Sequence, residues 1–97
     1  MKFYQQGDVI LIPVQSVKGS KRNNHLAEGE ATGHYHGAQG EGVSVLEDDG
    51  TRYLDAPNGA TVDHQEHKTI SVPPGKYQVR IVREFDHLEE IEREVRD

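Results

Sequence analysis

Short runs of β-branched and aromatic residues, each ended by a turn signal, are the feature that most limits how this 97-residue chain can fold. Turn signals recur at intervals of roughly 8–12 residues, which is typical of a small sandwich or barrel. They include Asp48-Asp49-Gly50, Pro57-Asn58-Gly59 and Pro73-Pro74-Gly75. The strand-like runs are residues 9–14, 43–47, 51–54, 60–62, 69–72 and 77–85. We therefore predict an all-β domain of about seven to eight short strands.

Three further stretches complete the expected architecture. Residues 15–24 are rich in Ser, Lys, Gly and Asn and predict a loop, and Gly37-Ala38-Gln39-Gly40 predicts a turn or mobile loop. Residues 25–32 alternate small and larger side chains, which favours a strand packed closely against a neighbour.

The spacing of the apolar residues changes in the last twelve residues of the sequence. Leu88, Ile91 and Val95 are spaced three and four residues apart among charged side chains, which predicts an amphipathic helix over residues 86–97. Asp86 is a suitable N-cap for it. The length of the chain predicts one domain, residues 1–97, that consists of the β-structure and this helix.

Composition limits the classes of function. Only 33% of the residues are hydrophobic and there is no Trp, so the core is expected to be thin, and a bound metal or a homodimer interface would supplement it. A net charge of −6 argues against binding to nucleic acid or to an anionic membrane surface. Without cysteine there are no disulfides or thiolate ligands. No apolar stretch has the length of a membrane span or a signal peptide, which predicts a cytoplasmic protein.

The strongest functional signal is His34-Tyr35-His36. Side chains alternate along a strand, so His34 and His36 are expected on one face and Tyr35 on the other. Neutral imidazole is a common ligand of divalent metals, and two on one face provide half of a metal site.

His64 and His67 arrive about thirty residues later and are the candidates for further ligands. On a strand they would face opposite sides, whereas in a turn both could face the same side. Glu41 and Glu66 are candidate carboxylate ligands or catalytic bases. Nitrogen and oxygen donors without thiolate suit Zn, Mn, Fe, Ni or Cu.

His34-x-His36 followed by Glu41 resembles the first motif of the cupins, and Pro73-Pro74-Gly75 resembles part of their second motif. The resemblance implies a β-barrel in which His34, His36 and Glu41 lie near a metal ion. At the position of the histidine ligand in the second motif this chain has Gln78, so His64 or His67 would take that role.

A resemblance that spans nearly the whole chain is to an uncharacterised group of small bacterial and phage-encoded proteins. The matching segments are Gln6-Gly7-Asp8-Val9, residues 29–36, Pro73-Pro74-Gly75-x-Tyr77 and Arg83-Glu84-Phe85. This resemblance implies no activity.

Three hypotheses follow. The first is a cupin-like domain that binds one divalent metal through His34, His36 and His67, completed by His64 or Glu41; as an enzyme it would act on a small molecule, with Glu41 or Glu66 as base. The second is a non-catalytic structural or protein-interaction module in which four protein ligands close the coordination sphere. The third is a β-domain whose histidines are ordinary polar residues.

Overall fold

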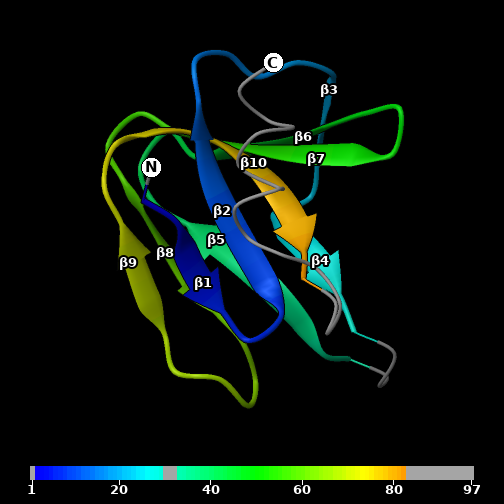
Figure 1. Ribbon diagram of the computed structural model, residues 1–97, viewed down its shortest axis with the longest axis vertical. Helices are drawn as coiled ribbons and strands as arrows, with labels where there is room; N and C mark the ends of the chain where they lie inside the picture. Colours follow the sequence, from blue (N-terminus) through cyan, green and yellow to red (C-terminus); the bar gives the residue numbers. More distant parts are fainter. Residues whose placement is uncertain (1, 30–32, 83–97) are drawn as a thin grey trace.

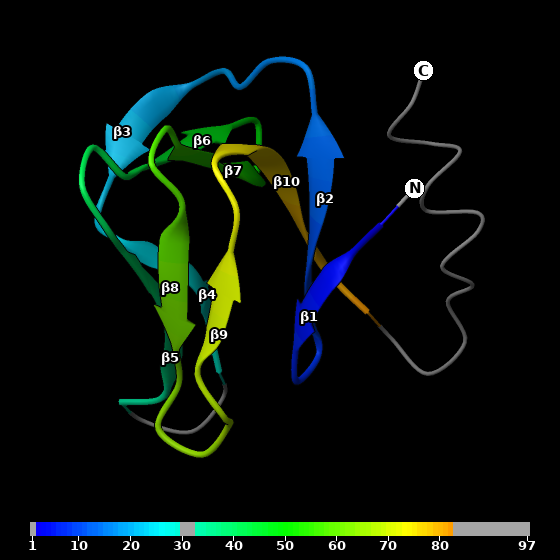
Figure 2. The ribbon, with the colours of Figure 1, turned by 90° about the vertical axis from the view of Figure 1, so that its left-hand side faces the viewer.

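The computed structural model describes residues 2–29 and 33–82 and shows two antiparallel β-sheets. The strands are β1 (Tyr4–Gln6), β2 (Val9–Val14), β3 (Ser20–Arg22), β4 (His25–Glu28), β5 (Tyr35–Gln39), β6 (Ser44–Asp48), β7 (Thr51–Ala56), β8 (Ala60–Asp63), β9 (Ile70–Val72) and β10 (Gly75–Ile81). The six-stranded sheet has the order β1-β2-β10-β7-β6-β3, and the four-stranded sheet has the order β4-β5-β8-β9 (Figures 1 and 2). The prediction of an all-β fold is confirmed for the described residues.

The core lies between the two sheets. Its largest members come from both of them, with Leu11 and Tyr77 on the six-stranded sheet and Leu26 and Val62 on the four-stranded sheet. Alternate residues of β2 point the other way, where Ile10 and Ile12 pack with Phe3 and Val82 in a second small cluster. Burial on both faces explains why residues 9–14 form an uninterrupted apolar run instead of an alternating one.

An ion-pair network ties β4, at the edge of the four-stranded sheet, to the six-stranded sheet. Arg52 on β7 places Nη2 2.8 Å from Oε1 of Glu28 on β4, and its Nε lies 3.0 Å from Oε1 of Glu47 on β6. Arg22 on β3 places Nη1 3.0 Å from the same Glu47 oxygen. Two guanidinium groups thus bridge carboxylates from both sheets.

The predicted turns at Asp48-Asp49-Gly50 and Pro73-Pro74-Gly75 are confirmed. Asp49 and Gly50 have φ of 49° and 80°, the two positive values that a tight hairpin between β6 and β7 requires. Pro73 and Pro74 carry the chain from β9 in one sheet to β10 in the other.

Two loop predictions are wrong. Residues 37–40 were expected to form a turn, but Gly37 to Gln39 belong to β5, which pairs with both β4 and β8. Residues 15–24 include the edge strand β3, which pairs with β6. The three-residue strand β1 was not predicted at all, and the described residues hold ten strands, where seven to eight were expected.

The predicted C-terminal helix, residues 86–97, lies outside the described residues. The part of the chain that the structure describes holds no helix with the length and apolarity of a membrane span.

Candidate functional site

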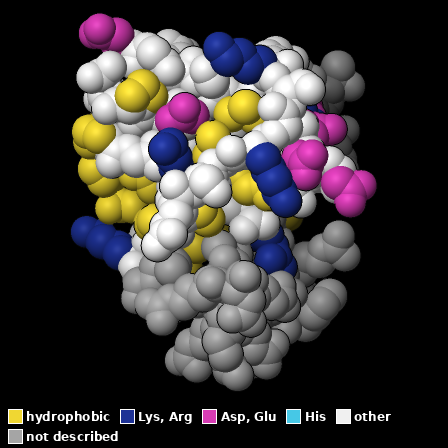
Figure 3. Space-filling view, turned by 90° about the horizontal axis from the view of Figure 1, so that it is seen from above, with side chains coloured by type: hydrophobic (Ala, Val, Ile, Leu, Met, Phe, Trp, Pro, Cys, Tyr) yellow, Lys and Arg dark blue, Asp and Glu magenta, His cyan; other side chains and the backbone are white. Residues whose placement is uncertain are grey.

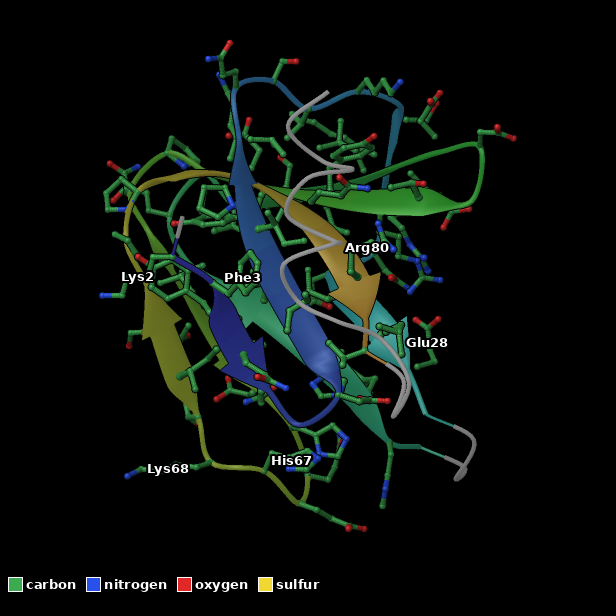
Figure 4. The ribbon with its side chains drawn as sticks, viewed as in Figure 1. Lys2, Phe3, Glu28, His67, Lys68 and Arg80 are labelled. Atoms are coloured by element: carbon green, nitrogen blue, oxygen red, sulfur yellow. The ribbon has the colours of Figure 1, made fainter. Side chains whose placement is uncertain are left out.

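Four histidines gather at one end of the molecule. His36 lies on β5 and His34 immediately precedes that strand, while His64 and His67 lie on the loop between β8 and β9. We call these four side chains the histidine cluster. Figure 4 shows His67 at the lower end of the view, with Lys68 directed away from it. No histidine side chain is visible among the described atoms of the face in Figure 3, which views the molecule from above.

Each ring of the cluster contacts at least one other ring of the cluster. His64 is central, with its ring centroid 4.4 Å from that of His36, 4.6 Å from that of His67 and 5.7 Å from that of His34. The centroids of His36 and His67 are 5.9 Å apart. Side chains separated by up to thirty-three positions in sequence therefore share one small volume.

The loop explains why His64 and His67 face the same side. β8 ends at Asp63 and β9 begins at Ile70, so both histidines lie in a turn, where the alternation of a strand does not apply. The Thr69 hydroxyl donates to Oδ1 of Asp63 across a distance of 2.7 Å and closes the base of the loop. Within the loop, the Glu66 N–H donates to Nδ1 of His64 across 3.0 Å.

His36 is the buried member of the cluster, with 4% of its surface exposed. Its Nδ1 lies 2.9 Å from Oε1 of Gln6, a side chain on β1 that is itself 3% exposed. The Gln6 amide nitrogen donates to the backbone carbonyls of Val62 and Lys68 across 2.8 and 2.9 Å. β1 therefore supports the cluster from the opposite sheet.

Two carboxylates border the cluster. Oε1 of Glu66 lies 3.3 Å from Nδ1 of His34, and Oδ1 of Asp8 lies 3.7 Å from Nε2 of His36. Both carboxylate side chains are more than half exposed. They place negative charge beside the imidazoles, which favours a cationic ligand over an anionic one.

Burial and repulsion between neighbouring rings favour the neutral form of two of the imidazoles, His36 and His64. Desolvation lowers the pKa of His36 below its usual 6.5, and the neighbouring His64 lowers it further. The pKa of His64 is also lowered, first by desolvation and then by His67 and His34. Neutral imidazole is the form that coordinates metals, so the lowered pKa values of His36 and His64 favour the ligand form of these two side chains.

The structure brings together five of the six predicted site residues: His34, His36, His64, His67 and Glu66. Glu41 lies beyond the other end of β5, where its carbonyl accepts a hydrogen bond from the Asn58 side chain. β5 continues from His36 to its end at Gln39, a rise of about 10 Å, and Glu41 follows in the turn beyond that end. Glu41 is therefore remote from the cluster.

Sequence reasoning gave no role to Gln6, Gly7 and Asp8, although all three border the cluster. Gly7 has φ of +59°, and a Cβ on it would lie 2.5 Å from Nε2 of His67. The only available signal was the Gln6-Gly7-Asp8 segment of the family resemblance, because nothing local links these residues to histidines far along the chain.

The remaining described histidine lies elsewhere. His25 stacks on Tyr35 with centroids 3.7 Å apart, and its Nδ1 lies 3.2 Å from Oε2 of Glu28. Tyr35 thus points away from the cluster, as the alternation of β5 predicts. His25 serves as a histidine outside the site for comparison.

As they stand, no three or more His, Asp or Glu side chains within residues 2–29 and 33–82 are arranged to hold a metal ion. An ion bound tetrahedrally by imidazoles would space the ring centroids by about 5 Å, given metal–nitrogen distances of about 2.0–2.1 Å. The observed separations of 4.4–5.9 Å bracket that value. The rings of His36, His64 and His67 are thus at a suitable spacing from one another, and that of His34 is at a suitable spacing from His64. Ligation requires the rings to turn about their side-chain dihedral angles.

Comparison with known proteins gives one match. The model of a family described as a domain of unknown function (DUF8820) matches residues 5–82. This range includes the whole histidine cluster and its Gln6 contact. No curated protein and no solved structure gives a significant match.

Proposed function

The chain belongs to the DUF8820 family, and from its own geometry we propose that it binds one divalent transition-metal ion at the histidine cluster. The observation that carries the proposal is the contact of four imidazole rings, contributed by two separate segments, beside two carboxylates. Imidazole nitrogens suit Zn, Fe, Ni and Cu, and a carboxylate neighbour also admits Mn.

His34, His36 and His67 are the ligands that we propose first. His64 differs from them because its Nδ1 accepts the Glu66 N–H, which keeps the proton of the neutral ring on Nε2. To bind an ion, His64 must release that hydrogen bond or lose that proton. This hydrogen bond of His64 therefore favours a site with three protein ligands and an open fourth position.

An open fourth position supports a second candidate function, which is catalysis on a small molecule. Three protein ligands with one exchangeable position is the arrangement of catalytic zinc sites, and the ion would supply an activated water there. Glu66 is the base that we propose, because its carboxylate is exposed and borders the cluster, whereas Glu41 is remote from it. If His64 instead becomes a fourth ligand, the closed site would act as a structural staple.

We further propose that the two sheets form a cupin-like barrel. The support is the His-x-His motif, whose second histidine lies on a strand in the middle of the four-stranded sheet, facing the other sheet's β1. An experimentally determined structure of the metal-loaded protein would test this assignment.

Zinc titration followed by calorimetry tests the metal proposal. We expect about one equivalent to bind the wild type, and the double variant His34→Ala/His67→Ala to lose at least about 100-fold in affinity, because two of three ligands are removed. These two side chains are less buried than His36, so their removal spares the core.

The matched control is His25→Ala, which removes a histidine outside the cluster and should leave zinc affinity unchanged. Equal zinc affinity in all three proteins, or no binding to the wild type, would contradict the proposal.

A further inference from the structure

We propose that Gln6 is the positioning residue of the histidine cluster: its amide fixes which nitrogen of His36 faces the cluster and ties together the two ends of the loop that carries His64 and His67. The inference rests on the proposed metal site for its functional meaning. Its structural content is carried by three hydrogen bonds of one buried side chain.

The orientation of the Gln6 amide is determined by its partners. Its nitrogen faces two backbone carbonyl oxygens, those of Val62 and Lys68, which can only accept hydrogen bonds. The opposite orientation would place the amide oxygen against both carbonyls inside the protein. Oε1 of Gln6 must therefore be the atom that faces His36.

That orientation sets the tautomer of His36. The amide oxygen can only accept, so Nδ1 of His36, 2.9 Å away, must carry the proton. In a neutral imidazole the other nitrogen, Nε2, then has a free lone pair. Nε2 is the atom on the side of Asp8, 3.7 Å from its Oδ1, so the lone pair lies at the border of the cluster.

The two carbonyl bonds act on the other half of the cluster. Val62 pairs with Ile70 at the last rung of the ladder between β8 and β9, and Lys68 lies on the loop just before β9. Gln6 thus bonds both sides of the loop where the ladder ends. One amide holds the buried histidine and the base of the loop in a fixed relation.

This arrangement is the support that metal-binding histidines need. A ligating imidazole donates its other N–H to an acceptor, which fixes its orientation and raises its basicity. Loss of such a support weakens metal affinity by about 10–100-fold. Gln6 differs from the usual single acceptor because its nitrogen also anchors the segment that carries two other candidate ligands.

The test reads the His36 tautomer in metal-free protein labelled with ¹⁵N-histidine, by long-range ¹H–¹⁵N correlation at pH 7.5. We expect His36 in the wild type to be protonated at Nδ1 and unprotonated at Nε2. In Gln6→Met we expect this preference to be lost and the zinc dissociation constant to rise by about 10–100-fold. The control Gln5→Met, on the same strand, removes an exposed amide that donates to the Gly7 carbonyl, and it should change neither readout.

A proton on Nε2 of wild-type His36 overturns the inference without any variant, so it stays testable even if Gln6→Met fails to fold. A folded Gln6→Met that keeps the Nδ1 proton, or that binds zinc as tightly as the wild type, also overturns it. The expected tautomer together with no zinc binding would overturn the proposed metal function and support the assignment of His36.

Discussion

At the residue scale, the approach of Gly7 to His67 is the tightest constraint on the candidate site. Gly7 has a positive φ, and the absence of a side chain lets the His67 ring lie against the turn between β1 and β2. A glycine here has two separate effects: it allows the positive φ of the turn, and it leaves room for the His67 ring.

We predict that Gly7→Ala lowers the free energy of unfolding by about 1–2 kcal/mol, since a side chain is strained in the left-handed region. It should also displace the His67 ring and weaken zinc binding, because the new Cβ would overlap Nε2. Denaturant titration and zinc calorimetry measure the two effects.

Gly50→Ala is the matched control. Gly50 also has a positive φ, +80°, but a Cβ there would meet nothing within 4 Å. It should lose comparable stability and keep full zinc affinity. If both variants bound zinc equally well, the steric role of Gly7 would be refuted.

At the element scale, the ion-pair network holds β4 against β6 and β7 across the two sheets. The hydrogen bond from Arg52, which dominates over burial, lowers the pKa of Glu28 below its usual 4.5. A carboxyl group whose pKa is lowered in the folded state stabilises the protein at pH values above its pKa in the unfolded chain. That contribution is lost as pH falls through its pKa in the folded protein.

We predict that Glu28→Gln lowers the free energy of unfolding at pH 7 by about 1 kcal/mol, the scale of a partly exposed ion pair. The difference from the wild type should shrink at pH values below 4.5, where the wild-type carboxyl group becomes protonated. Urea titrations at several pH values measure it. Glu41→Gln, outside this network, should change stability little; an equal loss in both variants would speak against the bridging role.

The sequence predicts those turns whose conformation depends on the residues within the turn itself. Asp49 and Gly50 adopt the positive φ values of a tight hairpin because few other residues tolerate them. The same logic failed for Gly37 and Ala38, which suggest a turn in sequence but lie buried in the central strand β5. There, a Cβ on Gly37 would lie 3.0 Å from the Tyr35 ring, so packing selects the glycine.

For the candidate site, the sequence alone singles out His34 and His36, because the two-residue period of a strand would place them on one face. In the structure His36 lies on β5 and His34 immediately precedes it. The orientation of His64 and His67 could not be predicted, because it depends on where β8 ends. Gln6 could not be found, because it reaches His36 from the other sheet and no local pattern encodes that contact.

At the scale of the whole molecule, the histidine cluster couples stability to pH. His36 and His64 both have a lowered pKa, chiefly through desolvation. At pH values between the pKa of these groups in the folded protein and their usual pKa of 6.5, the unfolded chain binds more protons than the folded protein. The contribution of these two histidines to stability is therefore fully present above pH 6.5, and it is lost as pH falls from 6.5 through their folded pKa values.

We predict that the metal-free wild type, measured with a chelator present, loses unfolding free energy between pH 7.5 and pH 5.5. His64→Asn should lose less over the same range, because it removes one of the two groups that take up a proton on unfolding. This window lies above that of Glu28, so the two effects separate along the pH axis. Stability that is constant or rises toward pH 5.5 in the wild type would contradict the prediction.

The long reach of Gln6 has a consequence for biosynthesis. The carbonyls that it bonds lie 56 and 62 residues further along the chain, so the arrangement does not exist until Lys68 has emerged from the ribosome. A shorter nascent chain offers an ion His34 and His36 without the second pair of imidazoles, and two ligands release an ion readily. On the proposed metal function, loading of this site would be restricted to a chain whose synthesis has passed its second histidine pair.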